Sequence, residues 1–107
     1  MVSEIRQLSK DLLGDITAIR HHLHQHPELS FNESNTSAFI QAELTKLGIP
    51  FKAGYAGTGI VATLKGGLPG GRVIALPADM DALPIDENTQ VPFKSCNQGV
   101  MHGCGHD

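Results

Sequence analysis

Six apolar residues recur at intervals of three and four along the first quarter of the sequence, and they constrain the fold more than any other feature. They are Ile5, Leu8, Leu12, Ile16, Ile19 and Leu23. Because residues at this spacing share one face of an α-helix, they predict a helix over residues 3–26 that packs on another element. Pro27 follows and ends the helix, since proline has no backbone N–H to donate inside it.

A second helix is predicted over residues 33–47. Ser30 or Asn32 can cap its start, and Gly48 follows its last apolar residue and favours a stop. Three residues are expected to face inward: Ala38, Phe39 and Ala42.

Two short apolar runs follow and are typical of neighbouring strands. They span residues 59–64 and 72–78, and the turn-forming sequence KGGLPGG separates them. Pro77 is expected at the end of its strand, because proline cannot donate to a central ladder. Helices followed by strands that are apolar on both faces predict an α/β fold.

Composition and charge bound the class of protein. The chain has 107 residues, of which 40% are hydrophobic and 18% charged, with a formal net charge of -3. These values fit one small globular domain and argue against a disordered or nucleic-acid-binding protein. The sequence has no signal-peptide pattern and no apolar run of the roughly 20 residues that span a membrane. We therefore expect a cytoplasmic protein without nucleic acid or membrane partners.

Two aspartates follow the second apolar run. Asp79 and Asp81 stand two apart in ADMDALP, and residues two apart in an extended backbone point to the same side. Both carboxylates can therefore point towards one metal or reaction centre. A simpler interpretation is that an Asp-x-Asp after a strand only forms a turn or caps a helix.

Cys104 and His106 repeat this spacing in the last residues, GCGHD. Thiolate and imidazole are ligands of zinc and similar transition metals. Taken alone, a cysteine often behaves as a small buried hydrophobe, but two pairs of metal-competent residues on either side of a loop of about twenty residues favour a metal site. Two ligands do not close such a site.

Four histidines lie near the end of the first predicted helix. His22 and His26 are four apart, a spacing that can chelate a metal, while His21 and His24 lie on other faces. No carboxylate or cysteine accompanies them in the helix, so we favour surface histidines that interact with the helix dipole.

Three segments carry a family resemblance. IRHHLHQHPELSFNE, ALPADMDALPIDE and GVMHGCGHD, in this order, resemble the start of the metal-dependent amidohydrolases that include hippurate hydrolase, N-acyl-amino-acid amidohydrolases and auxin-conjugate hydrolases. The resemblance implies that residues 1–107 are an incomplete N-terminal part of a zinc-peptidase-like catalytic domain, with a mixed sheet flanked by helices. Family members are several times longer, so we expect a truncated chain without the lid or dimerisation domain.

The resemblance also implies roles for individual residues. Cys104 and His106 match the metal ligands, and Asp81 matches the aspartate that orients the site. Asp79 stands where related peptidases have a metal-binding histidine, so both aspartates are candidate catalytic residues. Asp107 follows the ligand histidine and is expected to be its hydrogen-bond partner.

Two positions depart from the family pattern. The family commonly has arginine at the position of Pro77 and alanine at that of Gly103. The first departure removes any ion pair that the arginine makes, and the second is a minor change.

The implied reaction is hydrolysis of hippurate-like N-acyl amino acids to a carboxylic acid and an amino acid. One or two divalent ions, zinc, manganese or cobalt, would activate water and polarise the amide carbonyl. The general base and remaining ligands would come from downstream residues, so this chain alone is expected to be inactive. The resemblance leaves open whether the parent is a homo-oligomer. A metallo-dipeptidase, a deacetylase or a non-catalytic metal-binding module are the alternatives.

Overall fold

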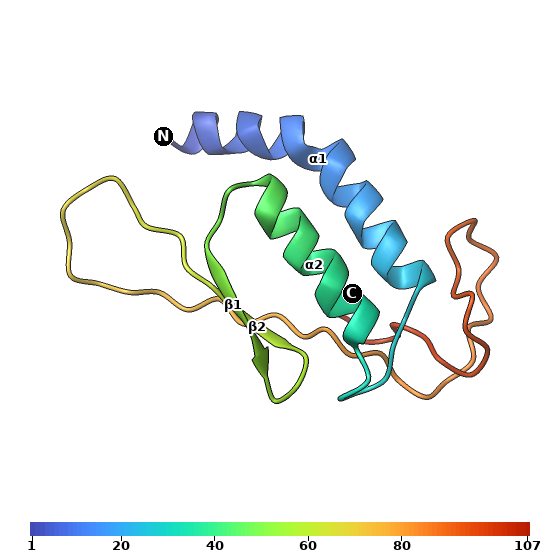
Figure 1. Ribbon diagram of the computed structural model, residues 1–107. Helices are drawn as coiled ribbons and strands as arrows, with labels where there is room; N and C mark the ends of the chain where they lie inside the picture. The colour runs from blue at the N-terminus through green and yellow to red at the C-terminus, as the bar shows by residue number, and fades with distance from the viewer.

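Two helices and a two-stranded hairpin follow one another along the computed structural model, which describes residues 1–107 (Figure 1). The elements are α1 (Val2–Gln25), α2 (Ser34–Lys46), β1 (Phe51–Tyr55) and β2 (Gly59–Ala62). Helices combined with a sheet confirm the predicted α/β class. Neither helix combines the length and the apolar character that a membrane crossing requires.

Helix α1 ends where the sequence predicted, but most of its apolar face is uncovered. The His26 N–H still donates to the His22 carbonyl at 3.1 Å, and the buried Pro27 then turns the chain. Leu8 and Leu12 are 60% and 52% exposed. The expected packing along the whole face is therefore wrong, and only the C-terminal end of α1 contacts other segments.

The N-terminus of α2 is capped by a residue from the preceding turn. The Glu28 carboxylate accepts hydrogen bonds from the backbone N–H groups of Asn35 and Thr36, at 3.2 and 2.6 Å, and from both side chains. Burial raises the pKa of Glu28, but these hydrogen bonds together lower it below its usual value. The predicted caps, Ser30 and Asn32, do not fill this role, because Ser30 Oγ donates to Asp81 and Asn32 Nδ2 donates to the Ser30 carbonyl.

The inward face of α2 also differs from the prediction. Phe39 is half-buried and stacks on the His22 ring, with 4.1 Å between centroids, but Ala38 and Ala42 are exposed. Thr36 and Ser37 are buried instead. The first turn of α2 faces the chain reversal after Pro27, so small polar side chains occupy the contact.

The hairpin pairs β1 and β2 in antiparallel register, with Phe51 opposite Ala62. A Cβ at Gly59 would lie 2.6 Å from the Tyr55 carbonyl oxygen, so glycine is required where the second strand begins. The predicted strand over residues 59–64 is confirmed as β2, and its partner β1 is an element that the sequence analysis missed.

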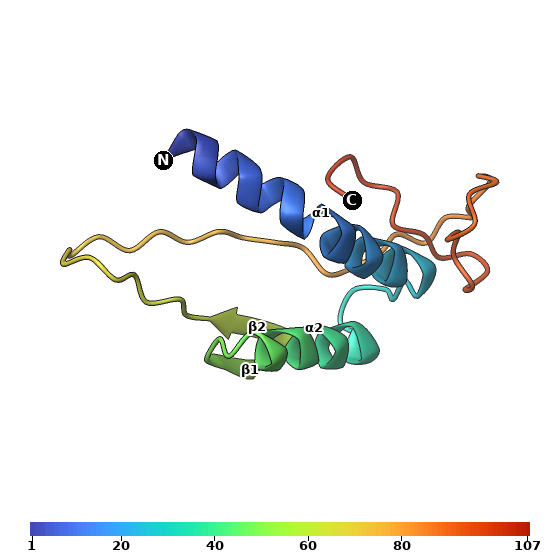
Figure 2. The same ribbon diagram turned by 90° about the horizontal axis from the view of Figure 1, so that it is seen from above.

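The strand predicted over residues 72–78 does not form. After β2 the chain runs outward and back, and in both views no second strand is paired with it (Figure 1, Figure 2). Val73, Ile74 and Leu76 are 83–95% exposed. A strand needs a partner for its backbone donors and acceptors, and no segment of this chain offers one. The predicted mixed sheet is therefore reduced to the hairpin.

The buried part of the molecule is small and largely polar. Six residues are buried, and Ala82 and Pro27 are the only apolar ones among them. The radius of gyration is 15.8 Å, whereas a compact domain of this length has about 13 Å. The buried residues gather where the C-terminal end of α1, the start of α2 and the segment around Ala82 meet.

Candidate metal centre

Two short backbone bridges bring the aspartate motif beside the C-terminal motif. Ala82 pairs with Leu29, and its N–H donates to the Glu28 carbonyl at 2.8 Å. Leu83 pairs with Met101 through two hydrogen bonds, of 2.9 and 3.0 Å. Segments about twenty residues apart in the sequence therefore lie side by side, with residues 79–81 next to residues 102–107.

Asp81 is held by a hydroxyl from the turn after α1. Ser30 Oγ donates to Asp81 Oδ2 at 2.6 Å. This hydrogen bond lowers the pKa of Asp81 more than desolvation raises it, and the nearby His102 and His106 act in the same direction. Asp81 is thus a fixed anion beside two histidines.

Asp79 and His106 face each other at the surface. Asp79 Oδ2 lies 3.6 Å from His106 Nδ1, and both side chains are more than half exposed. Cys104 is exposed and carries a free thiol. Asp79, Asp81 and His106 therefore lie in one neighbourhood, and Cys104 stands two residues from His106.

The donor set fits part of a metal coordination shell. Thiolate, imidazole and carboxylate are the donors that zinc and neighbouring transition metals prefer, but no three His, Cys, Asp or Glu side chains converge closely enough to hold an ion. Buried in the same neighbourhood, His102 Nε2 has no hydrogen-bond partner. Burial is the largest influence on His102 and lowers its pKa, which favours the neutral ring. The arrangement is an incomplete shell with one unpaired imidazole nitrogen.

His24 joins α1 to this neighbourhood, and it is not the surface residue that the sequence favoured. It is 4% exposed. Its Nδ1 lies 2.9 Å from Asp107 Oδ2, and its Nε2 lies 3.0 Å from Glu87 Oε1. Arg20 Nη2 donates to the same Asp107 oxygen at 2.8 Å. Asp107, which the sequence paired with the ligand histidine, instead binds His24 and Arg20.

Glu87 is the most strongly perturbed acid of the chain. Burial raises its pKa, but hydrogen bonds from the Thr89 hydroxyl, the Ser95 N–H and His24 outweigh burial and lower the pKa to about 2. Glu87 is therefore ionised at neutral pH. It is the last residue of ALPADMDALPIDE, one of the three segments that carry the resemblance, but nothing in its sequence context indicated the partner 63 residues away.

Phe93 fixes the same loop against α1. Its ring stacks on His21, with 3.7 Å between centroids and 8° between planes, and it meets His24 edge-on at 5.6 Å. The Arg20 guanidinium lies 5.6 Å from the Phe93 centroid. Loop and helix are thus joined by aromatic contacts as well as by charge.

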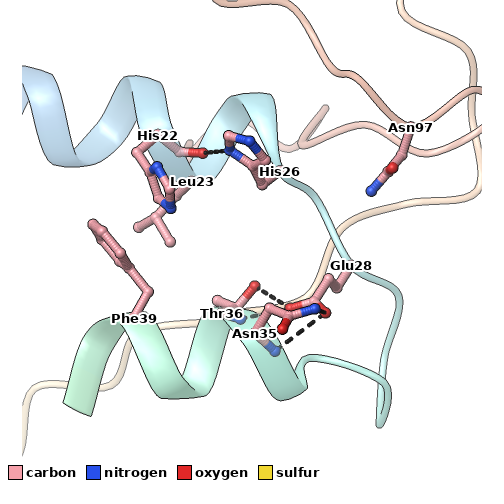
Figure 3. A pocket seen from close by; sticks show the side chains of 8 residues that line it. All are labelled: His22, Leu23, His26, Glu28, Asn35, Thr36, Phe39 and Asn97. Atoms are coloured by element: carbon pink, nitrogen blue, oxygen red, sulfur yellow. Dashed lines mark hydrogen bonds between the residues drawn. The ribbon is translucent and has the colours of Figure 1, made fainter. Parts of the chain in front are cut away.

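A cavity lies elsewhere, between the C-terminal end of α1 and the start of α2. Its volume is about 340 Å³, and His22, His26, Glu28 and Phe39 line it (Figure 3). The Glu28 carboxylate is already occupied by the cap of α2. Asp79, Asp81, Cys104 and His106 do not border this cavity, so it is separate from the site around His106.

Comparison with known proteins gives consistent matches. Peptidase family M20/M25/M40 matches residues 75–107. The N-acyl-L-amino acid amidohydrolase of Geobacillus stearothermophilus is 47% identical over 97% of this chain and 28% of its own length. The N-acetyl-L-cysteine deacetylase of Bacillus subtilis is 48% identical over 94% and 23%. Thermostable carboxypeptidase 1 of Saccharolobus solfataricus is 43% identical over 100% and 27%.

Solved structures match as well. The Bacillus subtilis YXEP protein, a dinuclear metal binding peptidase from the M20 family, superposes with a TM-score of 0.82 and 43% identity over 91% of this chain and 27% of that chain. A Staphylococcus aureus protein superposes with a TM-score of 0.88 and 40% identity over 99% and 28%. The chain spans about a quarter of the length of these relatives.

Proposed function

Because this chain belongs to peptidase family M20/M25/M40 and spans about a quarter of the length of its relatives, we propose that it is the N-terminal part of the catalytic domain of a metal-dependent amidohydrolase. The enzyme would hydrolyse the amide bond of N-acyl amino acids. The meeting of Asp79 and His106, next to Asp81 and Cys104, is the observation that carries the proposal.

Two relatives support the substrate class. The names of the Geobacillus enzyme and of the Bacillus deacetylase both describe removal of an acyl group from the nitrogen of an amino acid. Acetyl and hippurate-like benzoyl conjugates are therefore the substrates to test first. A cytoplasmic location stays a prediction of the sequence.

Cys104 and His106 would supply a thiolate and an imidazole to one or two divalent ions, zinc, manganese or cobalt. Such an ion, when bound, lowers the pKa of a coordinated water and polarises the amide carbonyl. Asp81 stays ionised because Ser30 donates to it, and its charge orients the neighbouring imidazoles. Asp79 contributes a second carboxylate within reach of His106.

Peptide hydrolysis is a second candidate. Two similar proteins from Saccharolobus solfataricus are named thermostable carboxypeptidase 1 and 2. A carboxypeptidase cleaves the amide bond before a C-terminal amino acid, which is the same type of bond as in an N-acyl amino acid. Rates on acyl amino acids and on dipeptides separate the two functions.

The experiment uses the full-length enzyme that carries this chain, assayed on acetyl- and benzoyl-amino acids with and without a chelator. The chelator should abolish turnover. Cys104→Ala should lower metal content and reduce the rate at least about tenfold, because a thiolate contributes to metal affinity. Cys96→Ala removes the other free thiol and is the matched control. Full activity in chelator, or wild-type metal content in Cys104→Ala, would contradict the proposal.

Asp81→Asn separates orientation from metal binding. The amide keeps the size of the side chain but loses the charge, so we expect bound metal with turnover reduced on the order of tenfold or more. Asp15→Asn, on the exposed part of α1, is the control. Undiminished turnover in Asp81→Asn would remove Asp81 from the site.

A further inference from the structure

His24 is an almost fully buried side chain with a carboxylate on each ring nitrogen. Asp107 Oδ2 lies 2.9 Å from Nδ1, and Glu87 Oε1 lies 3.0 Å from Nε2. Each ring nitrogen therefore has a carboxylate oxygen within hydrogen-bond distance, and the imidazole is held from both sides. The pKa of Glu87 is held at about 2, which keeps this acceptor ionised.

The contacts around His24 restrict the movement of its side chain. It lies on α1, its ring meets Phe93 edge-on, and Phe93 in turn stacks on His21 of the same helix. Glu87 is held independently by Ser95 and Thr89. The imidazole therefore has little freedom to follow movements of the C-terminal residues, and it can act as an anchor for them.

Asp107 connects His24 to the candidate ligands. Its side chain binds His24 and Arg20, and its backbone N–H donates to the Cys104 carbonyl at 3.2 Å. That hydrogen bond closes a turn whose members include both Cys104 and His106. These two residues are exposed and have few contacts of their own, so the position of the turn depends on how Asp107 is held.

We propose that His24 is a positioning residue of the metal centre. Its hydrogen bond holds Asp107 in place, and through the turn of residues 104–107 this sets the positions of the Cys104 thiolate and the His106 imidazole. The inference rests on the proposed function, since it assumes that these two residues bind metal. The hydrogen bonds of His24 go to Asp107 and Glu87, and none joins it to Cys104 or His106.

Cobalt(II) binding to the full-length metal-free enzyme tests the proposal. The absorption spectrum of bound cobalt reports its ligand geometry, and titration gives the affinity. In His24→Gln we expect cobalt affinity about 10- to 100-fold weaker than wild type, the range typical for the loss of an outer partner of a metal site, together with a changed spectrum. Asp107→Asn should reproduce both effects, and it keeps the test decisive if His24→Gln does not fold.

Two variants distinguish positioning from general packing. His26→Gln changes the exposed histidine that follows the last residue of α1, whose ring hydrogen-bonds only to the His22 carbonyl, and should behave as wild type. Glu87→Gln weakens the other half of the network but leaves the bond between His24 and Asp107, so it should lower thermal stability with cobalt affinity within about threefold of wild type.

The outcomes are separable. Wild-type protein that binds no cobalt would overturn the proposed metal function, and this inference with it. If wild type binds cobalt but His24→Gln and Asp107→Asn bind it with unchanged affinity and spectrum, the positioning role alone is overturned. Equal losses in Glu87→Gln and His24→Gln would likewise overturn it, because packing of the loop would then explain both.

Discussion

The two ends of α1 lie in opposite environments. At its C-terminal end, Arg20 and His24 are bound to Glu87 and Asp107, and we call the contact of residues 20–29 with residues 81–107 the junction. At its other end, Ile5, Leu8, Leu12 and Ile16 are all more than half exposed, as are the apolar residues of the segment 64–76. We call residues 2–16 and 64–76 the uncovered region.

The contrast shows which interactions a short chain can complete. Hydrogen bonds and ion pairs are directional and need only one partner each, so the junction forms from a few polar side chains. Hydrophobic stabilisation grows with the buried area, at about 25 cal/mol per Å², and an apolar face needs a whole element to cover it. The relatives are about four times as long as this chain, and we expect their further residues to cover the uncovered region.

The largest expected effect concerns the isolated chain. Residues 1–107, expressed alone, should show no amide hydrolysis, bind zinc at least about tenfold more weakly than the full-length enzyme, and self-associate through the uncovered region, because two protein ligands make a weak site and large apolar patches drive association. Calorimetry and sedimentation velocity measure the two properties.

A double substitution provides the control for this prediction. Leu8→Glu with Leu12→Glu places charges on the uncovered face of α1, away from the junction, and should reduce association without changing zinc binding. A monomeric wild-type chain that binds zinc tightly and hydrolyses acyl amino acids would show that the comparison of the two ends is mistaken.

Acid should weaken the junction. The pKa of Glu87 is about 2 in the folded state against 4.5 for the free side chain. The folded carboxylate stays ionised to lower pH than the unfolded one, so its contribution to stability is complete above about pH 4.5 and is lost as the pH falls towards 2. Urea unfolding of the full-length protein across this range should show a decline that is less steep in Glu87→Gln.

Glu4→Gln is the matched control, because Glu4 lies in the uncovered region with a side chain that is 80% exposed. It should lose stability with falling pH as the wild type does. Parallel curves for wild type and Glu87→Gln would mean that the hydrogen bonds to Glu87 do not depress its pKa in solution.

Local signals in the sequence predicted the helices well. The apolar spacing that ends at Pro27 places α1 within one residue of its observed bounds at each end, and Gly48 marks the stop of α2. The strand expected over residues 72–78 failed for a different reason. Its composition is suited to a strand, but a strand forms only with a partner, and local composition carries no information on whether one is present.

In the candidate site, too, local signals in the sequence were sufficient for some residues, whereas others depend on contacts with distant residues. Asp79, Asp81, Cys104 and His106 were predicted from residue type and spacing, and their roles stay predictions. Burial of His24 was missed because it depends on Glu87 and Asp107, which lie 63 and 83 residues away in the sequence. Helical position alone assigned His24 to the surface, and only the tertiary contact reverses that assignment.

The smallest expected effect tests how rigid the junction is. A Cβ at Gly103 would lie 2.7 Å from Ile85 Cδ1, but this methyl is the far end of a side chain that is 44% exposed and can rotate towards solvent. Gly103→Ala in the full-length protein should therefore change the free energy of unfolding by less than about 0.5 kcal/mol, as most surface substitutions do. Gly59→Ala is the contrast, because its Cβ would meet the Tyr55 backbone carbonyl, which cannot rotate away, and it should cost about 1–3 kcal/mol. A loss in Gly103→Ala as large as in Gly59→Ala would mean that Ile85 is fixed, and that the junction extends to the surface beside Cys104.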